Sequence, residues 1–503
     1  MLCRDSLKKE YRVKTSRVVW ASSVSGILLM AGCSSSPFDR DVGAWGDRDD
    51  LRSRRSGLLA NYGPATSATS PSAGEGNEVP AGAGAEDYVR LALARNPSIR
   101  AAEAKVQRLA ERIPQVTSLD DPMLQIAPIG EMAETAAGQV GVMTGISQKL
   151  PFPGKLATRG RIASQEVAQA AMELAQTKLN VVADVRRAYW SYYFAGQAIE
   201  VTRQTRELLR QFHEIADTRF RTGQANQADV LRASVELSNL DNELITFDQR
   251  QATAAAMLNS LLDRPVSASL PKARPAELLP VELRLDSLLA QATVANPELP
   301  KIHHRIEAES QRQKLARLQR YPDLTVSANY NLVDDQGLSM AANGKDQWWI
   351  GFSINVPIWF GKYRAAEREA LYGRQEAIAD LGAAQNRIAF RVQDALVRVE
   401  TQQRQVQLFR DVIIPQAKQT VDASRAGYQA GRVDFLTLVD NWRRLLNYEL
   451  LYYQNLSQLE KDFAELEQVV GQAVVRQPSA AATAPATTQP SLPAEKQRSD
   501  IHE

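Results

Sequence analysis

The stretch Pro-Phe-Pro-Gly-Lys at residues 151–155 returns as Pro-Ile-Trp-Phe-Gly-Lys at residues 357–362. Proline lacks a backbone N–H, so it suits a place where a strand ends and the chain bends into the next element. We therefore expect a bend from strand to helix in each stretch. The residues predicted to form these bends are Pro151, Pro153, Gly154, Pro357 and Gly361.

Two other landmarks recur around this motif in the same order. Asn-Pro at residues 96–97 returns at residues 296–297, and an aromatic-x-x-Gly turn ends at Gly223 and again at Gly431. All the offsets lie between 200 and 208 residues. Landmarks in one order at a nearly constant offset indicate two copies of one unit. We predict the first copy over residues 84–270 and the second over residues 271–475.

Each copy is predicted to contain a helix, two strands and two long helices. The first helices are expected at 87–116 and 286–320, and the strands at 123–126, 139–150, 324–330 and 348–356. In the strands apolar residues alternate with small or polar ones, as when one face meets an apolar phase and the other meets water. Aromatic residues near the strand ends could mark a membrane interface or belong to an ordinary sheet core; they are Tyr330, Trp348, Trp349 and Trp359.

The longest helices are predicted after each Gly-Lys, over 159–221 and 364–429, with Pro415 as an interior breaker. At 1.5 Å rise per residue each would reach about 90 to 100 Å. Apolar positions follow the alternating three- and four-residue spacing of coiled-coil seams; they are Val182, Val185, Tyr189 and Tyr192, then Val399, Val406, Phe409 and Ile413. Each helix is expected to turn at a glycine and return as an antiparallel partner over 225–261 or 433–470.

The N-terminus has the order of a secretory signal. Basic residues precede an apolar run over residues 18–30, and Ala-Gly-Cys closes it at residues 31–33. The run is too short to span a bilayer. Small residues before Cys33 resemble the bacterial lipobox, so we expect a signal peptide over 1–32 and lipid attachment at Cys33; a chance cysteine after an ordinary signal is the alternative. Ser34 in place of aspartate favours the outer membrane.

The flanking segments and the charge narrow the function further. Residues 33–83 are predicted to be a lipid-anchored flexible leader, and residues 476–503 a disordered tail. The 60 basic and 58 acidic residues nearly balance. The chain therefore has no strong net positive potential that would attract nucleic acid. No phosphate loop, HExxH or G-x-S-x-G motif occurs, and the four histidines are scattered. We therefore expect no enzyme activity, no metal site and no cofactor.

Two strands per copy give four per chain, too few to close a barrel in a membrane, where open sheet edges are not tolerated. Three chains would supply about twelve strands, inside the range of bacterial barrels. The sequence therefore predicts a homotrimer that is mainly α with a transmembrane β-barrel, whose long helices form an α-barrel. A cluster of aromatic residues at 190–194 is expected to be helix-packing core.

Together these features resemble the TolC-type outer-membrane efflux factors, over roughly residues 84 to 472. The resemblance rests on the lipobox-like start, the duplicated unit and the three recurring landmarks. It implies a conduit in outer-membrane lipid that opens when an inner-membrane pump and its periplasmic adaptor dock. Within the family, the Pro-Phe-Pro-Gly-Lys form is similar to the heavy-metal-resistance branch.

The resemblance also implies functional positions at the glycine turns. The residues expected to face the adaptor are Thr222, Gly223, Gln224, Ala430, Gly431 and Arg432. Glycine there permits a positive φ and close approach of a partner; a plain helix cap is the compatible alternative. Family channels carry acidic gate residues after the second turn, at positions that correspond here to Thr437 and Asp440, so only Asp440 matches. Asp229 is the counterpart of Thr437 in the first copy.

Three copies of Asp440 near an axis would repel one another or hold a cation, whereas a favourable charge on a solvated helix face is the plainer interpretation. A lipid-anchored periplasmic coiled-coil scaffold or adaptor without a pore is the main alternative for the whole protein, and a lipoprotein enzyme is the third. Metal ions, drugs and dyes, and a secreted polypeptide stay open as cargo.

Overall fold

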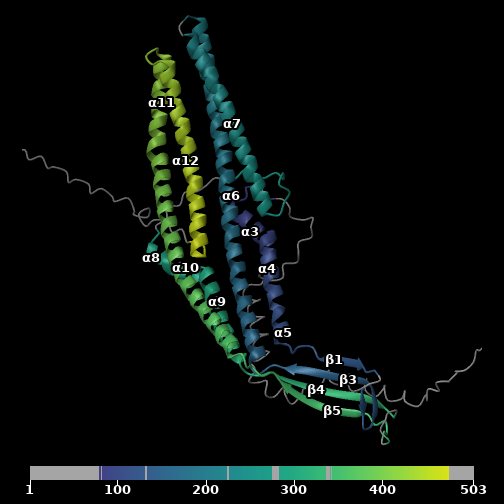
Figure 1. Cartoon of the computed structure of the whole chain (residues 1–503). Coiled ribbons are helices and arrows are strands. Elements are labelled where there is room, and N and C mark those ends of the chain that lie inside the picture. The colour runs from purple at the N-terminus through teal and green to yellow at the C-terminus, as the bar shows by residue number, and fades with distance from the viewer. Residues whose placement is uncertain are drawn as a thin grey trace, which may run out of the picture. The chain divides into compact units, whose positions relative to one another are not determined.

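A computed structural model describes residues 79–80, 82–130, 133–223, 226–274, 283–335, 340 and 342–474. The predicted signal peptide, the lipid attachment residue Cys33, nearly all of the leader, Gln224 and the C-terminal tail lie outside these residues. Helices dominate the described part, with one sheet (Figure 1). Within it, no helix combines the length and apolar character needed to cross a membrane.

Both halves of the described chain contain short helices, an antiparallel strand pair and two long helical arms in the same order. The first half contains α3 (Ala85–Arg95), α4 (Pro97–Ala110), α5 (Arg112–Thr117), β1 (Met123–Pro128), β2 (Glu134–Thr135), β3 (Gly138–Leu150), α6 (Lys155–Arg221) and α7 (Gln227–Leu261). The second contains α8 (Leu285–Ala295), α9 (Glu298–Leu318), β4 (Leu324–Asp334), β5 (Gln347–Ile354), α10 (Phe360–Leu408), a π-helical turn (Phe409–Ile413), α11 (Ile414–Gln429) and α12 (Phe435–Val470). Within the described residues, α5 and β2 occur only in the first half and the π-helical turn only in the second. The short strand β2 was not predicted.

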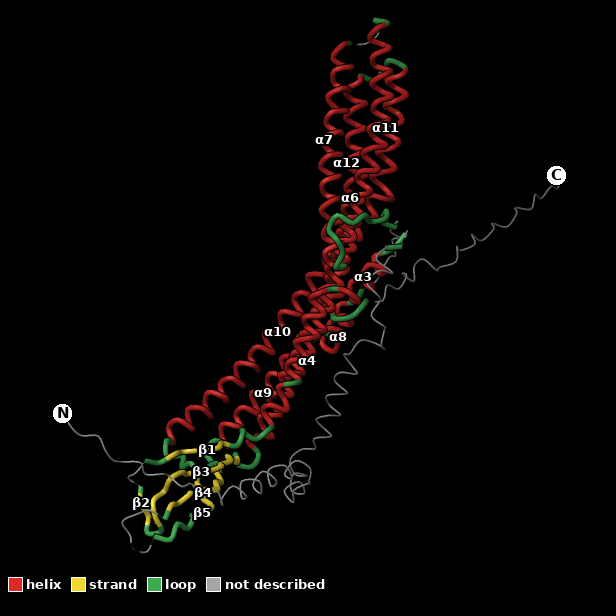
Figure 2. Tube along the Cα trace, turned by 90° about the vertical axis from the view of Figure 1, so that its right-hand side faces the viewer, coloured by secondary structure: helices red, strands yellow, loops and turns green. Residues whose placement is uncertain are grey.

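The strands form one antiparallel sheet in the order β1-β3-β4-β5, with β2 paired to β3 (Figure 2). The central pairing of β3 with β4 joins the two halves, with Leu150 opposite Leu324. Within the described residues, β1 and β5 are therefore the edges of the sheet. Each edge has backbone N–H and C=O groups available to pair with another strand.

One face of this sheet is apolar and exposed. The register places on it Leu124, Ile126, Ile146, Tyr330, Trp348, Ile350, Phe352 and Ile354, all of them exposed. Trp348 and Phe352 are each 72% exposed. The opposite face contains mostly small or polar residues, such as Gly145, Ser327 and Ser353. The four aromatic residues near the strand ends, Tyr330, Trp348, Trp349 and Trp359, are all exposed. The alternative that they belong to an ordinary sheet core was therefore wrong.

The predicted first helices, 87–116 and 286–320, are each interrupted at the Asn-Pro pair, so the expectation of unbroken helices was wrong. Proline disfavours helical backbone at the residue before it, and Asn96 adopts φ −59° and ψ 125°. Its side chain then caps the next helix by accepting from the Ser98 amide at 2.9 Å. Asn296 caps in the same way, accepting from the Glu298 amide at 2.8 Å.

The same two asparagines bind the ends of the returning helices. Asn96 Nδ2 donates to the Leu261 carbonyl at 2.9 Å, and Asn296 Nδ2 donates to the Val469 carbonyl at 2.6 Å. Both asparagines are 4% exposed. Each satisfies a carbonyl at a helix C-terminus, where intrahelical donors run out. The Asn-Pro landmark therefore joins the first and last helices of each half.

The long helices differ between the halves. The helix α6 is continuous over 67 residues and begins at Lys155, four residues before the predicted start. Its counterpart is divided by the π-helical turn just before Pro415. Proline removes an amide donor and clashes with the preceding turn, and a wider turn relieves both problems. Phe409 and Ile413 in this turn are half-buried, and the centre of the Phe409 ring lies 6.2 Å from that of the Tyr448 ring on α12, as expected of a seam position.

The helices pack through buried apolar clusters that combine both halves. Tyr192 and Tyr193 are at most 7% exposed, and Trp190 and Phe194 pack partly buried against the core clusters, which confirms the prediction that the aromatic cluster at 190–194 is helix-packing core. Farther along, one cluster contains residues of α6 and α7 together with residues of α11 and α12. The two helical hairpins therefore pack against each other over this region (Figure 2).

Candidate functional site

Both helical hairpins end in glycine turns with left-handed backbone. Gly223 has φ 74° and Gly431 has φ 70°, a conformation that favours glycine. The Gly223 amide donates to Phe220, and the Gly431 amide donates to Tyr428, so each turn satisfies carbonyls at a helix end. The predicted tip residues Thr222, Gly223, Ala430, Gly431 and Arg432 are all exposed.

Arg219 links the two hairpin tips, and sequence reasoning did not find it. Its Nη1 donates to the Tyr428 carbonyl at 2.7 Å, and its guanidinium carbon lies 4.9 Å from the centre of the Tyr428 ring. Tyr428 is buried, and burial raises the pKa of its hydroxyl. The contact joins α6 to α11 across 209 residues. No local pattern identifies such a pair, because only the packing of the hairpins places them together.

The predicted gate acids lie just beyond these turns. Asp440 is exposed on α12, whereas its neighbours Leu438, Val439 and Trp442 are buried against the other hairpin. Asp229 is half-buried in the first turn of α7. Among the described residues, neither carboxylate has an ion-pair partner. The Thr437 hydroxyl, at the other expected gate position, donates to Asp434.

Hydrogen bonds, an ion pair and a ring contact hold the first strand-to-helix bend against the start of the second half's strands. Lys155 Nζ donates to Asp323 Oδ1 at 2.7 Å and to the Tyr321 carbonyl at 2.9 Å. The Phe152 amide donates to the same carboxylate oxygen at 2.9 Å, and the Phe152 ring stacks on Tyr321 at 4.6 Å. The Lys155 and Asp323 side chains are only 6% and 12% exposed. The Pro-Phe-Pro-Gly-Lys motif therefore forms a bend and also supplies the lysine of an ion pair between the two halves.

The second bend is built differently. Gly154 has φ 91° and precedes α6 as its N-cap, whereas Gly361 lies inside the first turn of α10 and has no positive φ. The two glycines are therefore not conformationally equivalent, although the sequence motif groups them. Pro151, Pro153 and Pro357 all lie between a strand and the following helix.

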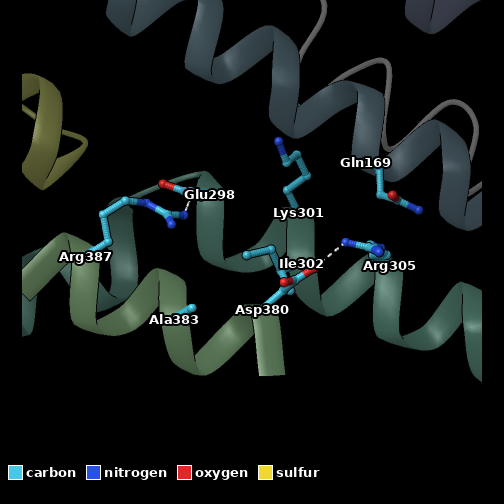
Figure 3. A pocket seen from close by; sticks show the side chains of 8 residues that line it. All are labelled: Gln169, Glu298, Lys301, Ile302, Arg305, Asp380, Ala383 and Arg387. Atoms are coloured by element: carbon cyan, nitrogen blue, oxygen red, sulfur yellow. Dashed lines mark hydrogen bonds and ion pairs between the residues drawn. The ribbon is translucent and has the colours of Figure 1, made fainter. Parts of the chain in front are cut away.

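A cavity of about 220 Å³ lies between α6, α9 and α10 (Figure 3). Its walls pair most of their charges: Arg305 contacts Asp380 at 2.6 Å, and Arg387 contacts Glu298. In the described part of the chain no group of three or more His, Cys, Asp or Glu residues could hold a metal ion. Ion pairs across this cavity therefore connect the helices that line it. Its lining residues do not place a nucleophile beside a base.

A family model, described as outer membrane efflux protein, matches residues 88–264 and 288–472. The match covers most of the chain, so this protein belongs to the outer membrane efflux protein family. The solved outer membrane protein VceC from Vibrio cholerae has the same fold. The TM-score is 0.65 at 19% identity, over 77% of this chain and 96% of that one.

Two curated relatives extend the comparison. The cobalt-zinc-cadmium resistance protein CzcC of Cupriavidus metallidurans is 24% identical over 402 residues, 77% of this chain and 89% of its own length. The toluene efflux pump outer membrane protein TtgC of Pseudomonas putida is 23% identical over 406 residues, 75% of this chain and 81% of its own length.

Proposed function

We propose that this chain is the outer-membrane channel component of a tripartite efflux or type I secretion system. The family membership carries the proposal, and the open sheet with one exposed apolar face supports it. The same observations argue against a pore-free scaffold or adaptor, which would have no use for such a face. In this role the protein is a passive duct and catalyses no reaction.

Three copies assemble the duct. Their sheets join edge to edge into a barrel of about twelve strands, within the range of bacterial outer-membrane barrels. The apolar face of each sheet meets lipid, and the face with Gly145, Ser327 and Ser353 lines the water-filled interior. The long helices of both repeats, which span residues 84–270 and 271–475, form the periplasmic α-barrel in the three copies.

The hairpin tips dock a periplasmic adaptor, and an inner-membrane pump supplies the energy. Exposed residues at both glycine turns, including Thr222 and Arg432, form the contact surface together with Gln224, which lies outside the described residues. The link between Arg219 and Tyr428 holds the two hairpins of one subunit together at this end. Docking then opens the duct by moving the hairpins against those of neighbouring subunits.

Asp440 forms the narrow part of the closed duct, with Asp229 nearby. Its exposed position on α12 supports this role, because the opposite side of that helix is packed against the other hairpin. Three carboxylates brought together attract a cation, which lowers their mutual repulsion.

A lipid on Cys33 anchors the mature chain to the outer membrane after removal of residues 1–32, and residues 33–83 then act as a leader. Two or three acyl chains anchor firmly, since each buried methylene contributes roughly 0.8 kcal/mol. Mass spectrometry of the mature N-terminus tests this step: an unmodified cysteine, or cleavage elsewhere, would contradict it.

Among the open cargo classes, which are metal ions, drugs or solvents, and secreted polypeptides, the relatives favour the first two. Two relatives support these classes, since one is a cobalt-zinc-cadmium resistance protein and the other is the outer membrane protein of a toluene efflux pump. A gene deletion grown on cobalt, zinc and cadmium salts, and separately on toluene, distinguishes them. Loss of growth on only one series assigns the cargo.

The channel itself is tested by single-channel conductance of the purified protein in planar bilayers. We expect small currents that a divalent cation added on the periplasmic side blocks. Asp440→Ala should lose the block, whereas Asp422→Ala, an exposed acid on α11, should keep it. Well-folded protein that never forms channels would contradict the proposal, and a block that survives Asp440→Ala would contradict only the gate.

A further inference from the structure

The buried ion pair between Lys155 and Asp323 lies at a junction between two strands that the duplication of the chain should repeat. Lys155 follows β3, and Asp323 precedes the neighbouring strand β4. The pair therefore closes the junction between two adjacent strands that belong to different halves of the chain. Because the chain is duplicated, the same junction should have a counterpart that involves β5 and β1.

The strand register identifies the counterpart of Asp323. In the first half Ser147 pairs with Met123, and in the second half Ser353 pairs with Thr325. The two serines each lie four residues before the proline of the recurring motif, so they are equivalent. Met123 is then equivalent to Thr325. The residue two positions earlier is an aspartate in both cases, Asp121 in the first half and Asp323 in the second.

The counterpart of Lys155 is Lys362, because each is the lysine of a Gly-Lys pair. Lys362 follows β5 and Asp121 precedes β1, so the two residues lie by the opposite edges of the sheet. Both are exposed, and within the described ranges neither has an ion-pair partner. The corresponding pair in the middle of the sheet is almost fully buried. Two complementary charges are thus left at the two open edges.

We propose that Lys362 of one subunit pairs with Asp121 of a neighbouring copy of this chain, and so repeats the tie between Lys155 and Asp323 across the subunit boundary. The inference rests on the proposed homotrimer and names the contact that closes it. Transfer of the β3–β4 register also places Ile354 opposite Leu124 and Phe352 opposite Ile126 of the neighbouring subunit. All four side chains belong to the apolar face, so that face continues from one subunit to the next without a break.

Charge reversal tests the pair. In purified protein in detergent, Lys362→Asp and Asp121→Lys should each lower the temperature at which the trimer dissociates by several degrees. The double variant should recover most of the loss, because it restores an opposite-charge pair. Lys345→Asp, which reverses an exposed lysine at the far end of β5, and Asp120→Lys, beside the proposed partner, serve as matched controls and should stay near the wild type.

A second measurement reports the contact directly. Trimers assembled from a mixture of ¹⁴N- and ¹⁵N-labelled chains are treated with a carbodiimide, which couples an amine to a carboxylate in contact with it. We expect mixed-isotope peptides that join Lys362 to Asp121, and peptides of a single isotope that join Lys155 to Asp323.

The outcomes separate this inference from the function on which it rests. Suppose the wild type is a trimer and neither Lys362→Asp nor Asp121→Lys lowers its dissociation temperature, or Asp120→Lys lowers it equally. Either result would overturn the Lys362 to Asp121 pair and leave the channel proposal standing. Wild-type protein that is monomeric in detergent and in native membranes would overturn both.

Discussion

The Asp323 carboxylate accepts hydrogen bonds from the Lys155 side chain and the Phe152 backbone amide, and it forms an ion pair with Lys149. Burial alone would raise the pKa of its carboxyl group, but the hydrogen bonds from Lys155 and Phe152 and the nearby lysine charges hold the pKa below its ordinary value of 3.8. A carboxylate with a lowered pKa stabilises the folded state above its ordinary pKa, and the contribution is lost as the pH falls through the folded value.

Lys155→Met should therefore lower the free energy of unfolding by about 3 kcal/mol, because it leaves a nearly buried carboxylate without its cation. The difference from wild type should hold at neutral pH and shrink below about pH 4 as Asp323 is protonated. Urea unfolding of the detergent-solubilised protein at several pH values measures it. Lys149→Met is the control: Lys149 lies 3.5 Å from the other carboxylate oxygen, its side chain is 50% exposed, and it should cost less than about 1 kcal/mol. Equal losses for both lysines would contradict the argument.

At the scale of the element, the Asn-Pro breaks decide how each half closes. The proline ends one helix and begins the next, and the asparagine fills both the new N-cap and the last carbonyl of the returning helix. One asparagine side chain thus accepts from a free amide at the start of the next helix and donates to a free carbonyl at the end of the returning helix. Without it, both groups would need water as a partner. Farther along, the second half departs from the first where a π-helical turn precedes Pro415.

Asn296→Ala should lower the free energy of unfolding by about 2 kcal/mol, since it removes a cap and leaves the Val469 carbonyl without this donor. Asn296→Asp retains the cap acceptor but loses the donor, so a carboxylate would then face the carbonyl and stability should also fall. Asn96→Ala should have a similar effect in the first half. Thermal unfolding together with hydrogen exchange at the C-terminus of α12 measures the change. Unchanged exchange there in Asn296→Ala would refute the link between the helices.

At the scale of the whole molecule, the sheet leaves two surfaces unsatisfied within one chain. One is the pair of strand edges, and the other is the exposed apolar face formed by alternate residues of neighbouring strands. A single subunit would expose both to water. The proposed assembly of three subunits in a membrane would satisfy both together, because edges would pair with edges and the apolar face would meet lipid.

Ile350→Lys should therefore reduce the amount of assembled channel in outer-membrane fractions, because a lysine on a lipid face costs about 2 to 4 kcal/mol near the bilayer centre. Ser353→Lys, on the same strand but the opposite face, should be tolerated, since its side chain would point toward water. Heat-modifiable migration of the trimer in gels compares the two variants. Equal assembly of both would argue against a lipid-facing surface on this side of the sheet.

The amino-acid sequence alone did not predict β2 or the breaks at the Asn-Pro pairs, but it was enough to predict the duplication, the main strands, the long helices and the glycine turns. Those features depend on local chemistry: proline lacks a donor, glycine tolerates the positive φ found at Gly223 and Gly431, and side-chain periodicity separates strands from helices. The tertiary structure alone decided which distant groups meet. The Lys155 to Asp323 pair, the Arg219 to Tyr428 link and the Asn296 bond to Val469 join residues 168, 209 and 173 positions apart. Such partners follow from the packing of whole helices and the register of strands, which no local pattern encodes.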